Sequence, residues 1–67
     1  MKSKKISVIM PSLNSGFYID EALKSCLSQD ELSEIIIVDG GSENDTISRI
    51  KKFKEKYSNI KLIIEKD

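Results

Sequence analysis

The sequence predicts an α/β fold in which a three-stranded parallel sheet is built by a strand–helix–strand–helix–strand chain. Short β-branched runs alternate with segments whose apolar residues recur at helical spacing, and this alternation indicates parallel strands joined by helices. At 67 residues the chain has room for at most one small domain. We therefore expect one βαβαβ unit with right-handed crossovers and the strand order 3-2-1.

The first half of this unit is predicted from two neighbouring segments. Ile6 to Met10 is a short apolar run of strand length, and we expect Pro11 to end it. A loop of turn-forming residues follows, and a helix is predicted over about residues 17–28. Its buried stripe should consist of Tyr18, Ile19, Ala22, Leu23, Cys26 and Leu27.

The second half repeats the pattern. The Ile-Ile-Ile-Val run that ends at Val38 is typical of a parallel strand with apolar side chains on both faces. A helix over about residues 45–57 follows, and Asn44 or Asp45 can cap its start. Residues 60–65 read as the last strand. The buried stripe of the second helix should consist of Ile47, Ile50, Phe53 and Tyr57.

The predicted topology leaves one face of the sheet without a helix. Right-handed crossovers in a 3-2-1 sheet place both helices on the same face. The run at residues 35–38, however, supplies apolar side chains to both faces. We therefore expect the second face to be covered by further chain or by a second copy in a homo-oligomer. The strand at residues 6–10 should be an open edge.

Composition excludes several classes of function. The 11 basic and 11 acidic residues cancel, so there is no net positive field, and we expect no nucleic-acid partner. One cysteine and no histidine exclude an internal disulfide and a Cys/His metal cluster. No segment approaches the roughly 20 apolar residues of a membrane-spanning helix.

Two loops are candidates for a ligand site, because ligands of open α/β sheets bind beyond the carboxyl ends of the strands. The Asp39 carboxylate is suited to accept hydrogen bonds from a ring N–H or from ribose hydroxyls, and Gly40 and Gly41 allow close approach to the backbone. Plainer interpretations remain open, since Asp39 could cap its turn, Ser42 could cap a helix and Cys26 could be a packed thiol. The candidate residues are Pro11, Ser12, Leu13, Asn14, Asp39, Gly40, Gly41 and Ser42.

Three segments at fixed spacing carry a family resemblance. Ser-Val-Ile-Met-Pro-Ser-Leu-Asn spans residues 7–14, Ser-Cys-Leu-Ser-Gln spans residues 25–29, and Glu-Ile-Ile-Ile-Val-Asp-Gly-Gly-Ser-Glu-Asn-Asp-Thr spans residues 34–46. Together they resemble the start of the family 2 glycosyltransferases, which are inverting nucleotide-sugar transferases with the Rossmann-like GT-A fold. The match covers nearly the whole chain, so we expect residues 1–67 to be a partial nucleotide-sugar-binding domain.

The resemblance implies a donor and roles for the site residues. The donor would be a nucleoside-diphosphate sugar, with a UDP-sugar favoured, and the acceptor a saccharide or glycoconjugate in polysaccharide biosynthesis. Asp39 would contact the ring N–H of the base, while Pro11, Ser12 and Leu13 would form a wall against it. Two positions depart from the pattern. Leu13 stands where many members have an aromatic residue, and Gly40 stands where many have a second aspartate.

The resemblance also places the metal and the catalytic base outside this chain. Family members hold a divalent Mg²⁺ or Mn²⁺ against the diphosphate with an Asp-x-Asp motif, and a later carboxylate acts as general base. Both would lie downstream of Asp67, so no catalytic or metal-binding residue is expected within residues 1–67, and the chain alone should be inactive. The expected location is the cytoplasm, including the inner face of the membrane.

Two other functions stay open from the sequence alone. One is a non-catalytic module that self-associates, and the other is a generic nucleotide-binding domain of Rossmann-like fold. The first strand is not followed by Gly-x-Gly-x-x-Gly, which counts against the generic binder.

Overall fold

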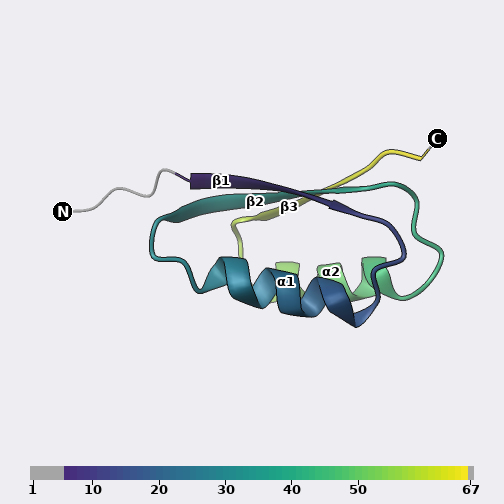
Figure 1. The fold of residues 1–67 in the computed structure, drawn as a ribbon, viewed down its shortest axis with the longest axis horizontal. Helices are drawn as coiled ribbons and strands as arrows, with labels where there is room; N and C mark the ends of the chain where they lie inside the picture. The colour runs from purple at the N-terminus through teal and green to yellow at the C-terminus, as the bar shows by residue number, and fades with distance from the viewer. Residues whose placement is uncertain (1–5, 67) are drawn as a thin grey trace.

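The computed structural model describes residues 6–66 and consists of a sheet packed against a layer of two helices (Figure 1). The strands are parallel and lie in the order β1-β2-β3, which is the predicted order 3-2-1 read from the other edge. The predicted fold class and strand order are therefore confirmed. The elements are β1 Ile6–Ser12, α1 Phe17–Leu27, β2 Leu32–Asp39, α2 Thr46–Lys56 and β3 Ile60–Ile64.

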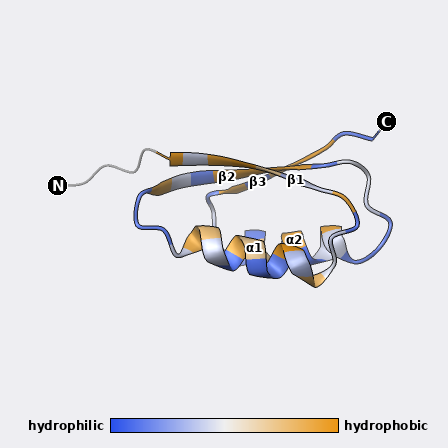
Figure 2. Ribbon diagram, in the orientation of Figure 1, coloured by the Kyte–Doolittle hydropathy of each residue, from blue (hydrophilic) through white to orange (hydrophobic). Residues whose placement is uncertain are grey.

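Both helices pack on the same face of the sheet (Figure 1). On β2, Ile35 and Ile37 point toward the helices and are completely buried. Because side chains alternate along a strand, Ile36 and Val38 point to the opposite face. All three strands accordingly show hydrophobic stretches, and each helix shows hydrophobic and hydrophilic sides (Figure 2). The buried core consists of Ile19, Leu23, Leu32, Ile35, Ile37, Ile50 and Ile60.

Two tyrosines lie outside the stripes predicted for them. Successive helix residues are rotated by about 100°. Tyr18 therefore points well away from the buried Ile19; it is 69% exposed and stacks on Phe17, with ring centroids 5.0 Å apart. Tyr57 is exposed because α2 ends at Lys56 and Tyr57 already has extended backbone angles. The prediction that these two rings are buried was wrong.

The first strand is longer than predicted. Pro11 does not end it, since β1 continues in register with β2 through Pro11, opposite Val38, and Ser12, opposite Asp39. Proline lacks the N–H that a central strand would need, but β1 is an edge strand of the described sheet and tolerates it. The extension sets Ser12 directly beside Asp39.

The face of the sheet away from the helices, here termed the open face, is largely apolar. Ile9 is 69% exposed on it, and Ile63 is also exposed. At one end of this face Lys61 forms an ion pair with Glu34 at 3.3 Å. The prediction that both helices cover a single face is confirmed. Strand alternation and register assign to the open face Ser7, Ile9, Pro11, Glu34, Ile36, Val38, Lys61 and Ile63.

Within residues 6–66, neither helix has the length and apolar character that crossing a membrane requires.

The two faces of the sheet should respond differently to the same substitution. Ile37→Ala removes a completely buried side chain and should cost about 2–5 kcal/mol of unfolding free energy, enough to unfold much of so small a domain. Ile9→Ala makes the same chemical change on the open face and should leave the unfolding transition nearly unchanged. Urea denaturation followed by circular dichroism measures both. Equal destabilisation by the two substitutions would contradict the one-sided core.

Candidate ligand-binding site

The loops that follow β1 and β2 lie side by side at one end of the molecule (Figure 1). The Gly40 N–H donates a hydrogen bond to the Ser12 carbonyl oxygen at 3.0 Å, which continues the pairing of the two strands into the loops. The candidate residues from two distant parts of the sequence are thereby brought together at the carboxyl ends of parallel strands.

Asp39 is the centre of this site. Its side chain is completely buried. Oδ1 accepts hydrogen bonds from the hydroxyls of Ser12 and Ser42, each at 2.6 Å. Oδ2 accepts from the backbone N–H groups of Gly41 at 2.9 Å and Ser42 at 2.7 Å. A carboxylate has about four acceptor positions, so hydrogen bonds within the chain occupy them all. A contact from Asp39 to a nucleotide base would require one of these bonds to break, and that contact stays a prediction.

The surroundings of Asp39 lower its pKa from 3.8 to about 2. Burial is the largest single influence and acts in the opposite direction, because it disfavours the charged form. The hydrogen bonds from the Ser12 and Ser42 hydroxyls and from the backbone of Ser42 and Gly41 favour the charged form and together outweigh burial. Asp39 is therefore a carboxylate at neutral pH.

Asn14 connects the two loops a second time. Its backbone N–H donates to the Ser42 hydroxyl oxygen at 2.8 Å, and that hydroxyl in turn donates to Asp39. The Asn14 side-chain oxygen accepts from the Glu43 N–H at 2.8 Å. Asn14 has a φ of 49°, a left-handed conformation that asparagine tolerates better than most residues. Asn14 therefore braces the first loop against the second.

A third connection joins the starts of the two helices. The Gly16 N–H donates to the hydroxyl of Thr46 at 2.9 Å, and that hydroxyl donates to the Asn44 side-chain oxygen at 2.6 Å. The Thr46 N–H donates to the same Asn44 oxygen at 3.0 Å. Thr46 is completely buried. Of the two predicted caps, Asn44 rather than Asp45 supplies the accepting side chain at the start of α2.

Leu13 and Gly40 lie together on the exposed side of the site. Leu13 is 60% exposed. A Cβ atom on Gly40 would lie 3.5 Å from Leu13 Cδ1, so the two positions border the same small area. Pro11 is the exception. Strand alternation turns its side chain toward the open face, which is the opposite side of the sheet from the Asp39 side chain. The structure therefore groups all the candidate residues except Pro11 around Asp39.

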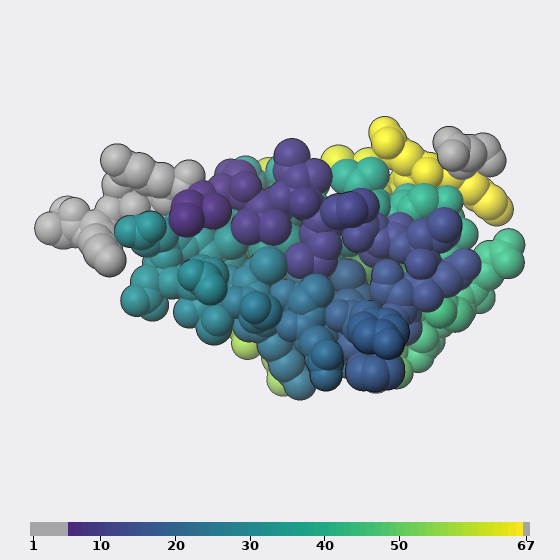
Figure 3. All heavy atoms as spheres, viewed as in Figure 1, coloured from purple at the N-terminus to yellow at the C-terminus, as the bar shows by residue number. Residues whose placement is uncertain are grey.

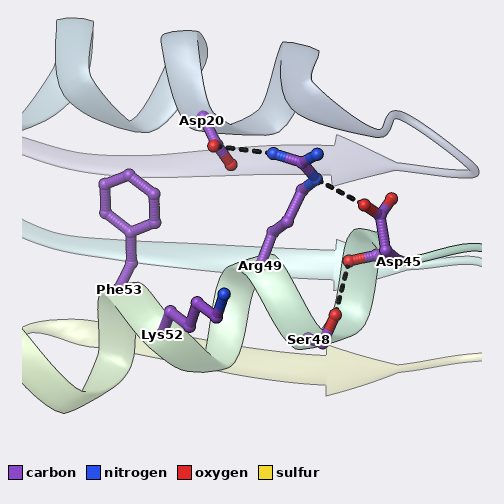
Figure 4. A pocket seen from close by; sticks show the side chains of 6 residues that line it. All are labelled: Asp20, Asp45, Ser48, Arg49, Lys52 and Phe53. Atoms are coloured by element: carbon purple, nitrogen blue, oxygen red, sulfur yellow. Dashed lines mark hydrogen bonds and ion pairs between the residues drawn. The ribbon is translucent and has the colours of Figure 1, made fainter.

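A separate pocket of about 180 Å³ lies between α1 and α2 (Figure 4). Arg49 crosses it and pairs with Asp20 through Nη1 at 2.9 Å and with Asp45 through Nε at 2.8 Å. Because Arg49 of α2 pairs with Asp20 of α1 across this pocket, we interpret it as a contact that holds the two helices together. Its lining residues are Asp20, Asp45, Ser48, Arg49, Lys52 and Phe53.

Residues 6–66 include no group of three or more cysteine, aspartate or glutamate side chains close enough together to hold a metal ion. The described residues therefore do not by themselves fit the divalent cation that the family resemblance implies.

The stability of the chain should depend on pH through Asp39. A carboxylate whose folded pKa is about 2, against an ordinary 3.8, contributes stability that is fully present above 3.8 and is lost as the pH falls toward 2. The difference in unfolding free energy between the wild type and Asp39→Asn should therefore narrow by about 2 kcal/mol between pH 5 and pH 2. Urea denaturation at both pH values measures it, and a constant difference would contradict the assigned pKa.

Comparison with known proteins identifies the family. The model of glycosyl transferase family 2 matches residues 7–66. An uncharacterized glycosyltransferase of Mycoplasma pneumoniae is 37% identical over 60 residues, which are 85% of this chain and 20% of that protein. A poly(ribitol-phosphate) beta-glucosyltransferase of Bacillus spizizenii is 37% identical over 62 residues, covering 88% of this chain and 10% of that protein. A poly(ribitol-phosphate) beta-N-acetylglucosaminyltransferase of Staphylococcus aureus is 41% identical over 56 residues, covering 76% and 17%.

The chain thus spans a fifth or less of the length of these three curated relatives. The family match nevertheless covers almost every described residue, including both loops that meet at Asp39. On this evidence the chain belongs to glycosyltransferase family 2.

Proposed function

We propose that this chain binds the nucleotide of a nucleoside-diphosphate sugar, as the N-terminal part of an enzyme that transfers the sugar to a saccharide or glycoconjugate. The observation that carries the proposal is the hydrogen-bond network around Asp39, which fixes the loops after β1 and β2 against each other. Ligands of parallel α/β sheets bind at this end of the strands. Membership of the family supports the class of reaction.

The geometry supports different roles for the buried and the exposed site residues. Asp39, Ser12 and Ser42 hold the loops, because their polar side-chain groups are engaged with one another. Leu13 and Gly40 offer the exposed surface on which a base would lie, with apolar contact from the leucine. Loops held in place before binding reduce the entropy lost when a ligand is bound.

The relatives support a proposal for the substrates. Two of them are named as poly(ribitol-phosphate) glycosyltransferases, one for glucose and one for N-acetylglucosamine. By analogy we propose a UDP-sugar donor and a polymeric acceptor in polysaccharide biosynthesis. The corresponding location would be the cytoplasm, at or near the inner face of the membrane.

Nucleotide binding should be visible in the purified chain. Titration with UDP should shift the backbone amide NMR signals of Leu13, Gly40 and Ser42, with smaller shifts at equal concentrations of GDP. Leu13→Ala should weaken UDP binding about three- to tenfold, because it removes apolar contact without disturbing a buried group. Ile9→Ala, a truncation of an exposed side chain on the open face, should leave UDP affinity unchanged. A folded chain whose spectrum does not respond to either nucleotide would refute the proposal.

Self-association through the open face is a second candidate function. The exposed Ile9 and Ile63 and the unpaired outer edge of β1 in the described sheet favour it. Apolar side chains and an open strand edge both provide surface for pairing with another copy.

Sedimentation equilibrium tests this second candidate. The wild type should associate more as its concentration rises, and Ile9→Lys should remain monomeric because a charge on the open face opposes burial. Lys51→Glu changes charge on an exposed position of α2 and should behave as the wild type. A wild type that is monomeric at all concentrations would exclude self-association.

A further inference from the structure

The segment that follows β3 runs along the candidate site. β3 ends at Ile64, and the Glu65 N–H donates to the Asp39 carbonyl oxygen at 2.8 Å. The chain therefore stays beside the end of β2 for at least one residue beyond the strand. In Figure 3 the last described residues, in yellow, lie at the same end of the molecule as the loops after β1 and β2.

Lys66 comes next and lies against the second loop of the site. A Cβ atom on Gly41 would be 2.8 Å from Lys66 Cγ, 3.3 Å from Cδ and 3.4 Å from Cβ. The methylene stem of Lys66 thus occupies the space that a side chain at position 41 would need. Gly41 also has a φ of 100°, which L side chains rarely adopt. Two independent constraints therefore require glycine here, and one of them is contact with Lys66.

Lys66 brings a positive charge to a candidate site that otherwise carries a negative one. The candidate residues identified from the sequence include an ionised aspartate and no cation. Arg49 is paired with Asp20 and Asp45, and Lys61 is paired with Glu34. Lys66 is exposed and has no carboxylate partner among residues 6–66, and its methylene stem lies against the site loop at Gly41.

We propose that Lys66 is a further ligand-binding residue, whose ammonium group contacts the diphosphate of the nucleotide held by the loops after β1 and β2. A lysine ammonium is a mobile point charge on a flexible stem, and it binds phosphate oxygens through charge-assisted hydrogen bonds. The stem lies against Gly41, which puts the ammonium group within reach of a ligand at the second loop. This inference rests on the proposed function, because it assigns a contact within the same nucleotide site.

Dissociation constants for UDP and for uridine test the assignment, because the two ligands differ only in the diphosphate. Lys66→Gln keeps most of the stem and removes the charge. It should weaken UDP binding about fivefold and leave uridine binding unchanged. Lys66→Arg keeps the positive charge and should retain UDP affinity. Lys61→Gln is the matched control, since Lys61 is exposed on β3 and points to the open face; it should change neither constant.

The possible outcomes separate this inference from the function on which it rests. A wild type that binds neither UDP nor uridine refutes the proposed nucleotide site itself. Binding of UDP that Lys66→Gln leaves unchanged refutes the role of Lys66 alone. Equal weakening of UDP and uridine by Lys66→Gln also refutes it, because the stem would then act only by packing on Gly41. Selective loss of UDP affinity, restored in Lys66→Arg, supports it.

Discussion

The buried carboxylate of Asp39 is the constraint on which the rest of the site depends. A charged group shielded from water is costly unless hydrogen bonds replace the lost solvation. Here two hydroxyls and two backbone N–H groups supply them, from Ser12 at the end of β1 and from Gly41 and Ser42 in the loop after β2. These bonds hold the end of β1 against that loop. The same requirement accounts for β1 continuing through Pro11, since only that register brings Ser12 beside Asp39.

The site is continuous with the hydrophobic core, because one strand serves both. Ile35, Ile37 and Asp39 occupy alternate positions of β2 and all point toward the helix layer. The first two fill the core and the third organises the loops. Loops are usually the mobile parts of a domain. In this chain they are connected at Asp39, at Asn14 and, through Gly16 and Thr46, at the helix starts. A ligand would meet a surface whose backbone is already arranged.

Local patterns were sufficient to predict the elements and the two loops, because hydrophobic period and turn residues are local properties. The interpretation that Asp39 caps its turn is confirmed by the hydrogen bonds from the Gly41 and Ser42 N–H groups. The patterns did not predict that Asp39 is buried and also bonded by Ser12, although a signal was present. Asp39 stands two residues after Ile37, so strand alternation alone directs it to the buried face, where a carboxylate needs partners. The pairing of Ser12 with Asp39 depends on the register of β1 against β2. The position of Lys66 depends on the chain continuing alongside β2 after β3 has ended. Both are relations between distant segments, which periodicity does not reveal.

The adjacent residues Gly40 and Gly41 differ in how strongly the structure constrains them. Gly41 is fixed by its left-handed backbone and by the Lys66 stem that lies against it. Gly40 has no such backbone requirement, and a Cβ atom there would make only ordinary contacts, 3.5 Å from Leu13 Cδ1 and 3.9 Å from the Ser12 oxygen. A side chain at position 40 would therefore change the exposed surface next to Leu13 while leaving the network around Asp39 intact. Under the proposed function, the same network around Asp39 would serve different nucleotides, and the residues at positions 13 and 40 would discriminate between bases.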